Sequence, residues 1–170
     1  APGAVRADFE RSFRQQTFAY LAQLGETLRL TSLLEAKGYC VIALKGCALG
    51  HELYQPLPQA RHSSDIDLLV DPEDFAAVCA ILRTEGYTQE MPDRAMPPSA
   101  DSMARYLSNA FEYNHPARGI KVELHHRLLS DPETLATPFA ELLSRARWVP
   151  VGNGRVRCLG SEDLFVYLCC

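Results

Sequence analysis

The chain has 170 residues, of which 47% are hydrophobic and 22% are charged, and its formal net charge is −4. This length is sufficient for one domain with a substantial core, and the composition is that of an ordinary globular protein. The negative charge argues against general electrostatic binding to nucleic acid, and no run reaches the about 20 apolar residues that a membrane span needs.

The N-terminal part of the chain is predicted to be helical. Over residues 9–37, apolar side chains recur at steps of three or four positions, which is the period of an amphipathic helix, and Gly38 is a natural stop. A buried strand is expected over residues 39–45. Gly46 separates this strand from a short helix over residues 47–54.

The central part of the chain is predicted to contain a strand, a helix and a hairpin. Residues 65–70 read as a buried strand, and residues 71–74 are typical of a capped helix start, with the helix ending at Gly86. Residues 91–102 contain three prolines and are expected to form a loop. An antiparallel hairpin is expected over residues 109–126.

The last part of the chain is predicted to contain a helix over residues 138–145 and a strand pair over residues 148–159, which is followed by a further helix that Ser161-Glu162-Asp163 would cap. Because this last helix is still apolar where the sequence stops, we expect it to begin a longer, truncated helical region.

The order of these elements predicts an α/β (α+β) fold, in which helices flank a small mixed sheet. Three parts are expected: a helical segment that packs on the core (residues 1–38), the core itself (residues 39–160), and the start of the helical C-terminal region (residues 161–170).

Two carboxylates on a buried strand are the strongest functional signal in the sequence. Asp65 and Asp67 stand two residues apart in an otherwise apolar run, so their side chains point to the same face. Neighbouring carboxylates raise each other's pKa and resist burial, and a divalent cation removes this conflict. Because oxygen ligands suit Mg²⁺, we predict that both residues bind this metal.

A third acid, Glu123, follows on the second strand of the predicted hairpin. Its side chain alternates with the apolar Val122 and Leu124, so it leaves the opposite face. If this strand lies beside the aspartate strand, Glu123 joins Asp65 and Asp67, and three acids could hold two Mg²⁺ ions for in-line phosphoryl displacement. The alternative interpretation is that Glu123 occupies an ordinary exposed position.

Upstream of the acids, Leu44-Lys45-Gly46-Cys47 passes from a buried strand through a glycine into a helix. A helix N-terminus presents unpaired N–H groups and a positive dipole, and glycine allows a phosphate to approach closely. Such transitions are common in α/β folds, so this signal gains its weight from the acidic pair that follows.

In combination, these motifs resemble the uncharacterised nucleotidyltransferase family of the DNA polymerase β-like superfamily. The resemblance rests on Leu44-Lys45-Gly46, Tyr54, Arg61, Asp65-Ile66-Asp67-Leu68-Leu69-Val70 and Val122-Glu123-Leu124-His125. It covers the chain from about residue 33 to the terminal helix.

The resemblance implies a mixed-sheet catalytic core, two Mg²⁺ ions (with Mn²⁺ as a substitute) and a nucleoside triphosphate donor. It places Gly46 against the phosphates, Asp65 and Asp67 on the metal, and Glu123 as the third acid.

The sequence departs from the superfamily pattern in the phosphate loop, where Cys47 replaces the usual serine or glycine and offers only a weak hydrogen-bond donor. The gap from Cys47 to Asp65 is also longer than usual. Lys45 or Arg61 could supply positive charge to a triphosphate, and His125, which shares a face with Glu123, could orient that acid or touch the substrate.

Three functions are compatible with these residues. The first is a metal-dependent nucleotidyltransferase that transfers a nucleoside monophosphate from a nucleoside triphosphate, with ATP as the default donor. The second is a glycosyltransferase, because an Asp-x-Asp pair after a buried strand also serves metal-bound nucleotide sugars. The third is an inactive module that keeps the fold for binding or regulation.

The acceptor is not identified by the sequence, but the acidic composition favours a small molecule, peptide or protein over nucleic acid. The six cysteines lack metal-ligand spacing and lie mostly in apolar runs. Reduced, buried thiols in a cytoplasmic protein explain them better than disulfides or zinc.

Overall fold

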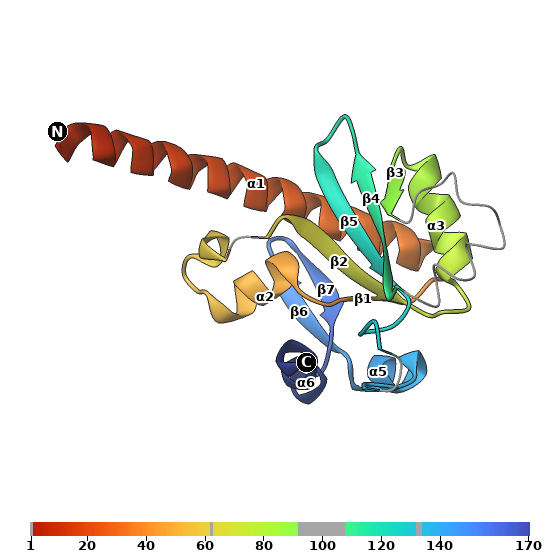
Figure 1. The fold of residues 1–170 in the computed structure, drawn as a ribbon. Coiled ribbons are helices and arrows are strands. Elements are labelled where there is room, and N and C mark those ends of the chain that lie inside the picture. The colour runs from red at the N-terminus through yellow and green to blue at the C-terminus, as the bar shows by residue number, and fades with distance from the viewer. Residues whose placement is uncertain (1, 62, 92–107, 132–133) are drawn as a thin grey trace.

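The structure, a computed structural model, describes residues 2–61, 63–91, 108–131 and 134–170 (Figure 1). The helices are α1 (Pro2–Ala36), α2 (Gly46–Leu53), the 3₁₀ turn η1 (Pro58–Ala60), α3 (Phe75–Thr84), α5 (Phe139–Arg145) and α6 (Ser161–Cys169). The strands are β1 (Val41–Ala43), β2 (Asp65–Val70), β3 (Thr88–Met91), β4 (Ala110–His115), β5 (Ile120–His125), β6 (Arg147–Val151) and β7 (Gly154–Cys158). None of the described helices has the length and apolar character required to cross a membrane.

In the described part of the chain, seven strands form one mixed sheet in the order β3-β4-β5-β2-β1-β7-β6. The central pair β2–β5 is parallel, as is β1–β7, whereas the hairpins β4–β5 and β6–β7 and the pairs β1–β2 and β3–β4 are antiparallel. Helices flank this sheet, so the predicted fold class is confirmed.

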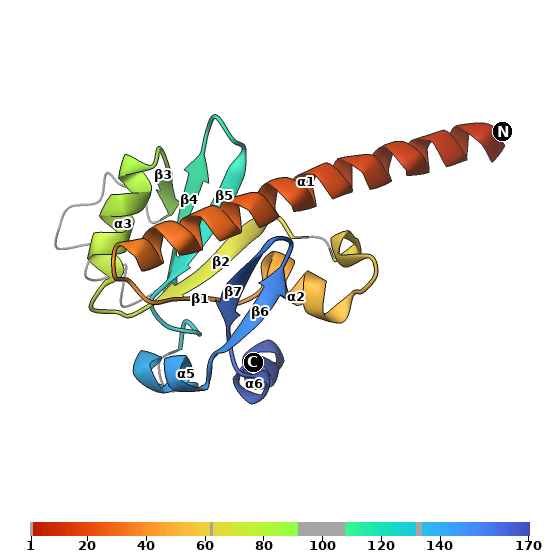
Figure 2. The same ribbon diagram turned by 180° about the vertical axis from the view of Figure 1, so that it is seen from behind.

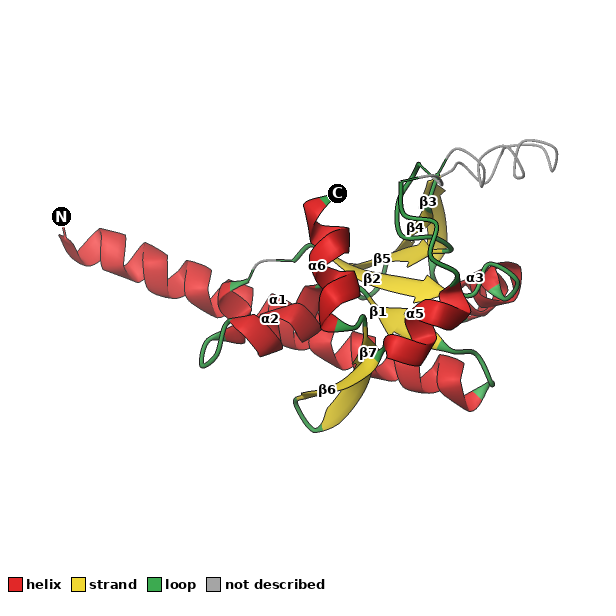
Figure 3. Ribbon diagram, turned by 90° about the horizontal axis from the view of Figure 1, so that it is seen from below, coloured by secondary structure: helices red, strands yellow, loops and turns green. Residues whose placement is uncertain are grey.

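Helices cover both faces of the sheet. Figure 2 shows α1 crossing one face, and apolar side chains of α1 and α3 pack there against the sheet in the larger of two cores. Helices α5 and α6 lie on the opposite side, as Figure 3 shows, where they form a smaller core with Ile42, Leu44 and Leu69. The molecule therefore has three layers, and the second face is covered more sparsely than the first.

Side-chain alternation along the central strands decides which residues meet on each face. On β2, Ile66 and Leu68 point into the larger core, whereas Asp67 between them points to the opposite face. On β5, Val122 likewise points into the larger core, whereas Glu123 points to the opposite face. Two apolar strands can therefore carry acids without placing them in the larger core.

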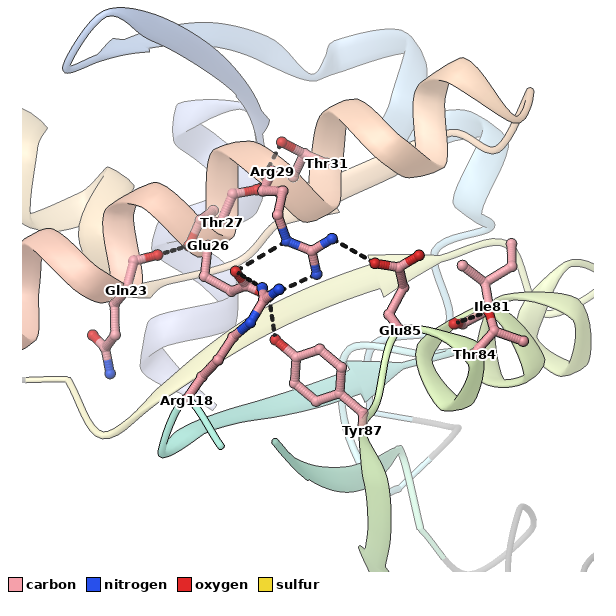
Figure 4. A network of polar contacts seen from close by, with 10 residues as sticks. All are labelled: Gln23, Glu26, Thr27, Arg29, Thr31, Ile81, Thr84, Glu85, Tyr87 and Arg118. Atoms are coloured by element: carbon pink, nitrogen blue, oxygen red, sulfur yellow. Dashed lines mark hydrogen bonds and ion pairs between the residues drawn. The ribbon is translucent and has the colours of Figure 1, made fainter. Parts of the chain in front are cut away.

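Helix α1 is anchored to the sheet by a buried carboxylate, Glu26 (Figure 4). Glu26 accepts hydrogen bonds from Arg29 at 2.8 Å, from the hydroxyl of Tyr87 at 2.7 Å and from Arg118 in the turn after β4. Arg29 in turn donates to Glu85 at 2.6 Å. Burial opposes ionisation of Glu26, but these donors outweigh it and lower its pKa to about 2.

Most predicted elements are confirmed, with differences at their ends. Helix α1 begins at Pro2, and its first half extends past the sheet (Figure 1). The predicted strand over residues 39–45 shortens to β1, and α2 already includes Gly46. The prediction of a loop from residue 91 was wrong at its first position, because Met91 ends β3; residues 92–102 lie outside the described residues.

The capping predicted for two helices is confirmed only in part, because Asp74 occupies the N-cap position of α3 but neither helix has a side-chain capping hydrogen bond. The N-cap position of α3 is Asp74, whose side chain makes no capping hydrogen bond, although Asp71 accepts one from the backbone of Glu73. At α6 the N-cap is Gly160, and Asp163 accepts hydrogen bonds from Arg145 of α5. This acid therefore ties two helices together instead of capping one.

Candidate active site

The parallel pairing of β2 and β5 creates a cluster of polar side chains. The register places Asp67 directly opposite Glu123, as the alternation of both strands requires. His125, two residues after Glu123, points to the same face, and its Nε2 lies 3.5 Å from Asp67 Oδ1 and 3.5 Å from Glu123 Oε2. One ligand atom from each of the three residues lies within 4.8 Å of the others.

Asp65 adjoins this cluster, and its environment differs from that of Asp67. Burial and the charges of Asp67 and Glu123 raise the pKa of Asp65. Burial also opposes ionisation of Asp67, but His125 and Lys45 outweigh it and lower the pKa of this carboxyl group. The imidazole of His125, whose Nε2 lies 3.5 Å from Glu123 Oε2, lowers the pKa of Glu123. The structure therefore separates the two aspartates into one that resists ionisation and one that is held ionised.

Lys45 supplies the positive charge that faces Asp67. Its Nζ lies 3.1 Å from Asp67 Oδ1, and Asp67 outweighs the effect of burial and raises the pKa of the lysine. The same ammonium group lies 5.6 Å from the ring centroid of Tyr167 on α6.

Two side chains near the cluster, Tyr167 and Asn109, were not singled out from the sequence. Tyr167 reads as one more core residue of an apolar helix, and only the return of α6 over the sheet brings its ring to Lys45. Asn109 precedes β4 and lies 3.3 Å from the Nδ1 of His125. No local pattern identifies either contact, because each joins distant parts of the chain.

The residues of the cluster fit a divalent cation. Asp67 Oδ1 and His125 Nε2 are both buried, and neither makes a well-directed hydrogen bond to any described residue. A buried carboxylate oxygen without such a bond needs a positively charged or hydrogen-bond-donating partner. In this structure the ammonium group of Lys45 lies 3.1 Å from Asp67 Oδ1, and a divalent cation would bring positive charge to the same oxygen. Carboxylate oxygens are the ligands that Mg²⁺ prefers, and an added imidazole nitrogen suits other divalent metals.

The predicted phosphate loop lies beside this cluster. Gly46 begins α2 with a φ of +69°, a conformation that side-chain-bearing residues rarely adopt. Arg61, from the segment before β2, donates from Nη1 to the carbonyl of Gly46 at 3.2 Å. Lys45, Gly46 and Arg61 are therefore held together at the N-terminus of a helix.

Cys47 points away from this loop. Its buried Sγ donates to Thr27 Oγ1 of α1 at 3.5 Å, and burial raises the pKa of the thiol. The side chain therefore contributes to packing between α1 and α2, and any contact of this position with a phosphate would come from the backbone.

The sequence model of a protein family described as "uncharacterised nucleotidyltransferase" matches residues 1–170. The chain belongs to this family, as its motifs had indicated. A search of curated proteins returns no match.

Proposed function

We propose that this member of the uncharacterised nucleotidyltransferase family is a metal-dependent enzyme that transfers a nucleoside monophosphate from a nucleoside triphosphate to an acceptor hydroxyl or phosphate group. The observation that carries the proposal is the pairing of Asp67 with Glu123 across two parallel strands, next to Asp65 and Lys45. Family membership supports the reaction class.

In this proposal, Asp67 and Glu123 hold the cation, and His125 orients the two carboxylates from between them. A bound Mg²⁺ or Mn²⁺ would stabilise charge on the transferring phosphate and favour ionisation of the acceptor. Asp65 completes the set of three carboxylates. Because Lys45 and His125 make their ion-pair contacts with Asp67 and Glu123, the carboxylate of Asp65 is the member of the set that would take the proton of the acceptor hydroxyl.

The phosphate loop would hold the rest of the donor. Backbone N–H groups at the start of α2 and the charges of Lys45 and Arg61 would bind the triphosphate near the cation. The acceptor oxygen attacks the α-phosphorus, the bond from this phosphorus to the bridging oxygen breaks, and pyrophosphate leaves. ATP is the default donor, and Mg²⁺, in two copies, is the default metal.

A second candidate function is a non-catalytic binding module of the same fold. It is favoured by Cys47, which places no hydroxyl group in the phosphate loop, and by Lys45, which already neutralises Asp67. The glycosyltransferase alternative has no support from the family match.

Metal binding and pyrophosphate release together test the proposal. Mn²⁺ binding is measured by electron paramagnetic resonance, and pyrophosphate release is measured with each of the four common ribonucleoside triphosphates. We expect Asp67→Asn and Glu123→Gln to lose both activities and the exposed control Glu73→Gln to keep them. Mn²⁺ binding without pyrophosphate release from any donor would favour the binding module, whereas equal Mn²⁺ binding by all variants would contradict the assigned site.

A further inference from the structure

A cavity of about 210 Å³ lies between α1 and the segment that connects α2 to β2. Helix α1 contributes Gln15, Gln16, Tyr20 and Gln23 to its wall, and the connecting segment contributes Gln59 and Arg61. This cavity is separate from the Asp67–Glu123 pair, and the roles proposed above do not use most of its lining.

The lining of this cavity is rich in side chains that form hydrogen bonds. Each of the four glutamines offers both hydrogen-bond donors and an acceptor. Arg61 is the one charged residue among the lining residues that the structure describes, and no carboxylate stands beside it there. In addition, the hydroxyl of Tyr20 is buried without a hydrogen-bond partner among the described residues. The cavity is therefore suited to a molecule that has several hydroxyl groups and one anionic group.

Hydrogen bonds connect this cavity to the candidate active site. Gln23 donates to the carbonyl of Ser63 at 3.0 Å, and Ser63 donates from its hydroxyl to the carbonyl of Asp65 at 3.0 Å. Gln23 also lines a second cavity, of about 10 Å³, whose wall includes Lys45 and Asp67. A ligand in the larger cavity would therefore lie next to the phosphate loop.

We propose that this cavity binds a phosphorylated, hydroxyl-rich small molecule, with Arg61 on its phosphate and the glutamine amides on its hydroxyl groups. The volume is below the about 300 Å³ at which pockets for drug-sized ligands begin, so it suits a sugar phosphate rather than a whole nucleoside triphosphate. Two sources share this chemistry: the ribose phosphate of the donor nucleotide and a sugar-phosphate acceptor. The proposal rests on the proposed function for its place in the reaction.

A pair of substitutions on α1 isolates the cavity. Ala19 lines it, whereas Ala22, which is also exposed on the same helix, does not. Ala19→Leu fills the cavity with a strong helix former and removes no hydrogen bond, and Ala22→Leu is its matched control. Arg61→Gln is a third variant, which removes the charge and keeps a polar side chain.

Binding is measured by calorimetry without metal, with ribose 5-phosphate, glucose 6-phosphate and the four nucleoside monophosphates as probes. We expect Ala19→Leu and Arg61→Gln to lower the affinity for the probe by about tenfold or more, and Ala22→Leu to leave this affinity unchanged. Binding of nucleotides would identify the donor as the source, and binding of sugar phosphates alone would identify the acceptor. If no probe binds, or if Ala19→Leu and Ala22→Leu bind equally well, the proposal is overturned.

The same titration separates this proposal from the proposed function. Asp67→Asn, which should lose Mn²⁺, is expected to keep the metal-free binding of the probe. If Ala19→Leu loses probe binding but retains Mn²⁺ binding, the cavity is the binding site of the probe, and this result does not depend on the cation site. Retained Mn²⁺ binding in a protein that binds no probe would overturn the cavity proposal alone.

Discussion

Asn109 donates a hydrogen bond from Nδ2 to Nδ1 of His125 at a distance of 3.3 Å. The orientation of this amide follows from a second bond, in which Nδ2 donates to the carbonyl of Leu128 at 3.2 Å. In the neutral imidazole Nδ1 therefore accepts, and the proton lies on Nε2, the nitrogen that faces Asp67 and Glu123. These two carboxylates outweigh the effect of burial and raise the pKa of His125. In this tautomer the Nε2–H group lies 3.5 Å from an oxygen of each carboxylate, and Nε2 has no free lone pair to offer a metal.

Asn109→Asp should reverse the tautomer of His125. A carboxylate at this position accepts a hydrogen bond from Nδ1–H, which leaves the Nε2 lone pair free for a metal beside Asp67. We expect the affinity for Zn²⁺ to rise by about tenfold. Calorimetric titration with Zn²⁺ and the ¹⁵N chemical shifts of the imidazole check this expectation. The gain should disappear in the Asn109→Asp/His125→Gln double variant, and an unchanged tautomer would refute the assignment.

The two aspartates should respond to substitution in opposite ways. Asp67 is 3% exposed and is held by Lys45 and His125, so Asp67→Asn removes the anionic partner of Lys45 and one of the two carboxylates beside His125, and should destabilise the fold by about 1–3 kcal/mol. Asp65→Asn removes a charge that Asp67 and Glu123 repel, and should leave stability at pH 7 unchanged or slightly higher. Urea unfolding of both variants in chelator measures the difference.

The pH dependence gives an independent check. The lowered pKa of Asp67 contributes stability above its unfolded value of 3.8, which is lost as the pH falls through the folded value. The raised pKa of Asp65 has the opposite sign, because ionisation costs stability above the folded value and this cost vanishes below 3.8. The gain from Asp65→Asn should therefore disappear in acid, and a gain that persists at pH 3 would show that it is not electrostatic.

Glu26→Gln should loosen the attachment of α1 to the sheet. Glu26 is 6% exposed and its pKa of about 2 lies below the usual 4.5, so its ionised form stabilises the fold. We expect a loss of about 2–3 kcal/mol at pH 7, because Arg29 and Arg118 lose their shared acceptor charge. The difference from wild type should be full above pH 4.5 and should shrink as the pH falls toward 2.

The control for this prediction is Glu10→Gln on the same helix, where an exposed carboxylate pairs with Arg6 one turn away. Such pairs contribute about 0.5 kcal/mol or less. Thermal unfolding of both variants should therefore separate them clearly, and similar losses would show that the Glu26 network does not anchor α1.

Local patterns were sufficient to predict the elements that carry the site. Apolar alternation identifies β2 and β5, and it also fixes the face from which Asp67 and Glu123 project. The sequence prediction had to assume that these two strands are neighbours. The parallel pairing of β2 with β5 confirms that they are. β3 was missed because its four residues, Thr88–Met91, show little alternation.

What the sequence could not provide is the set of partners that distinguishes Asp65 from Asp67. In the sequence, the two aspartates occupy equivalent positions on one face of the same strand, and their carboxylates are expected to repel each other. Lys45 follows β1 and is separated from Asp67 in the sequence by α2 and η1, and the antiparallel pairing of β1 with β2 brings its side chain to Asp67. His125 reaches Asp67 only through the register of β5. These contacts depend on sheet order, which no short motif encodes.

Lys45→Met tests whether the lysine occupies the place of a cation. The ammonium group lies 3.1 Å from Asp67 Oδ1, so it competes with a metal ion for that oxygen. Methionine keeps the length of the side chain and removes the charge. We expect the affinity for Mn²⁺ to rise by about tenfold, equivalent to about 1.4 kcal/mol, and the affinity for magnesium-free ATP to fall, because one phosphate partner is lost.

Lys121→Met is the matched control, because Lys121 lies on the same strand as Glu123 but pairs with the exposed Glu90. Mn²⁺ titration by electron paramagnetic resonance and ATP titration by calorimetry should leave this variant like wild type. If Lys45→Met loses affinity for Mn²⁺ as well as for ATP, the lysine shapes the site instead of competing for it. In that case Asp67 would need Lys45 to hold its carboxylate toward Glu123, and the cation would bind beside the ammonium group.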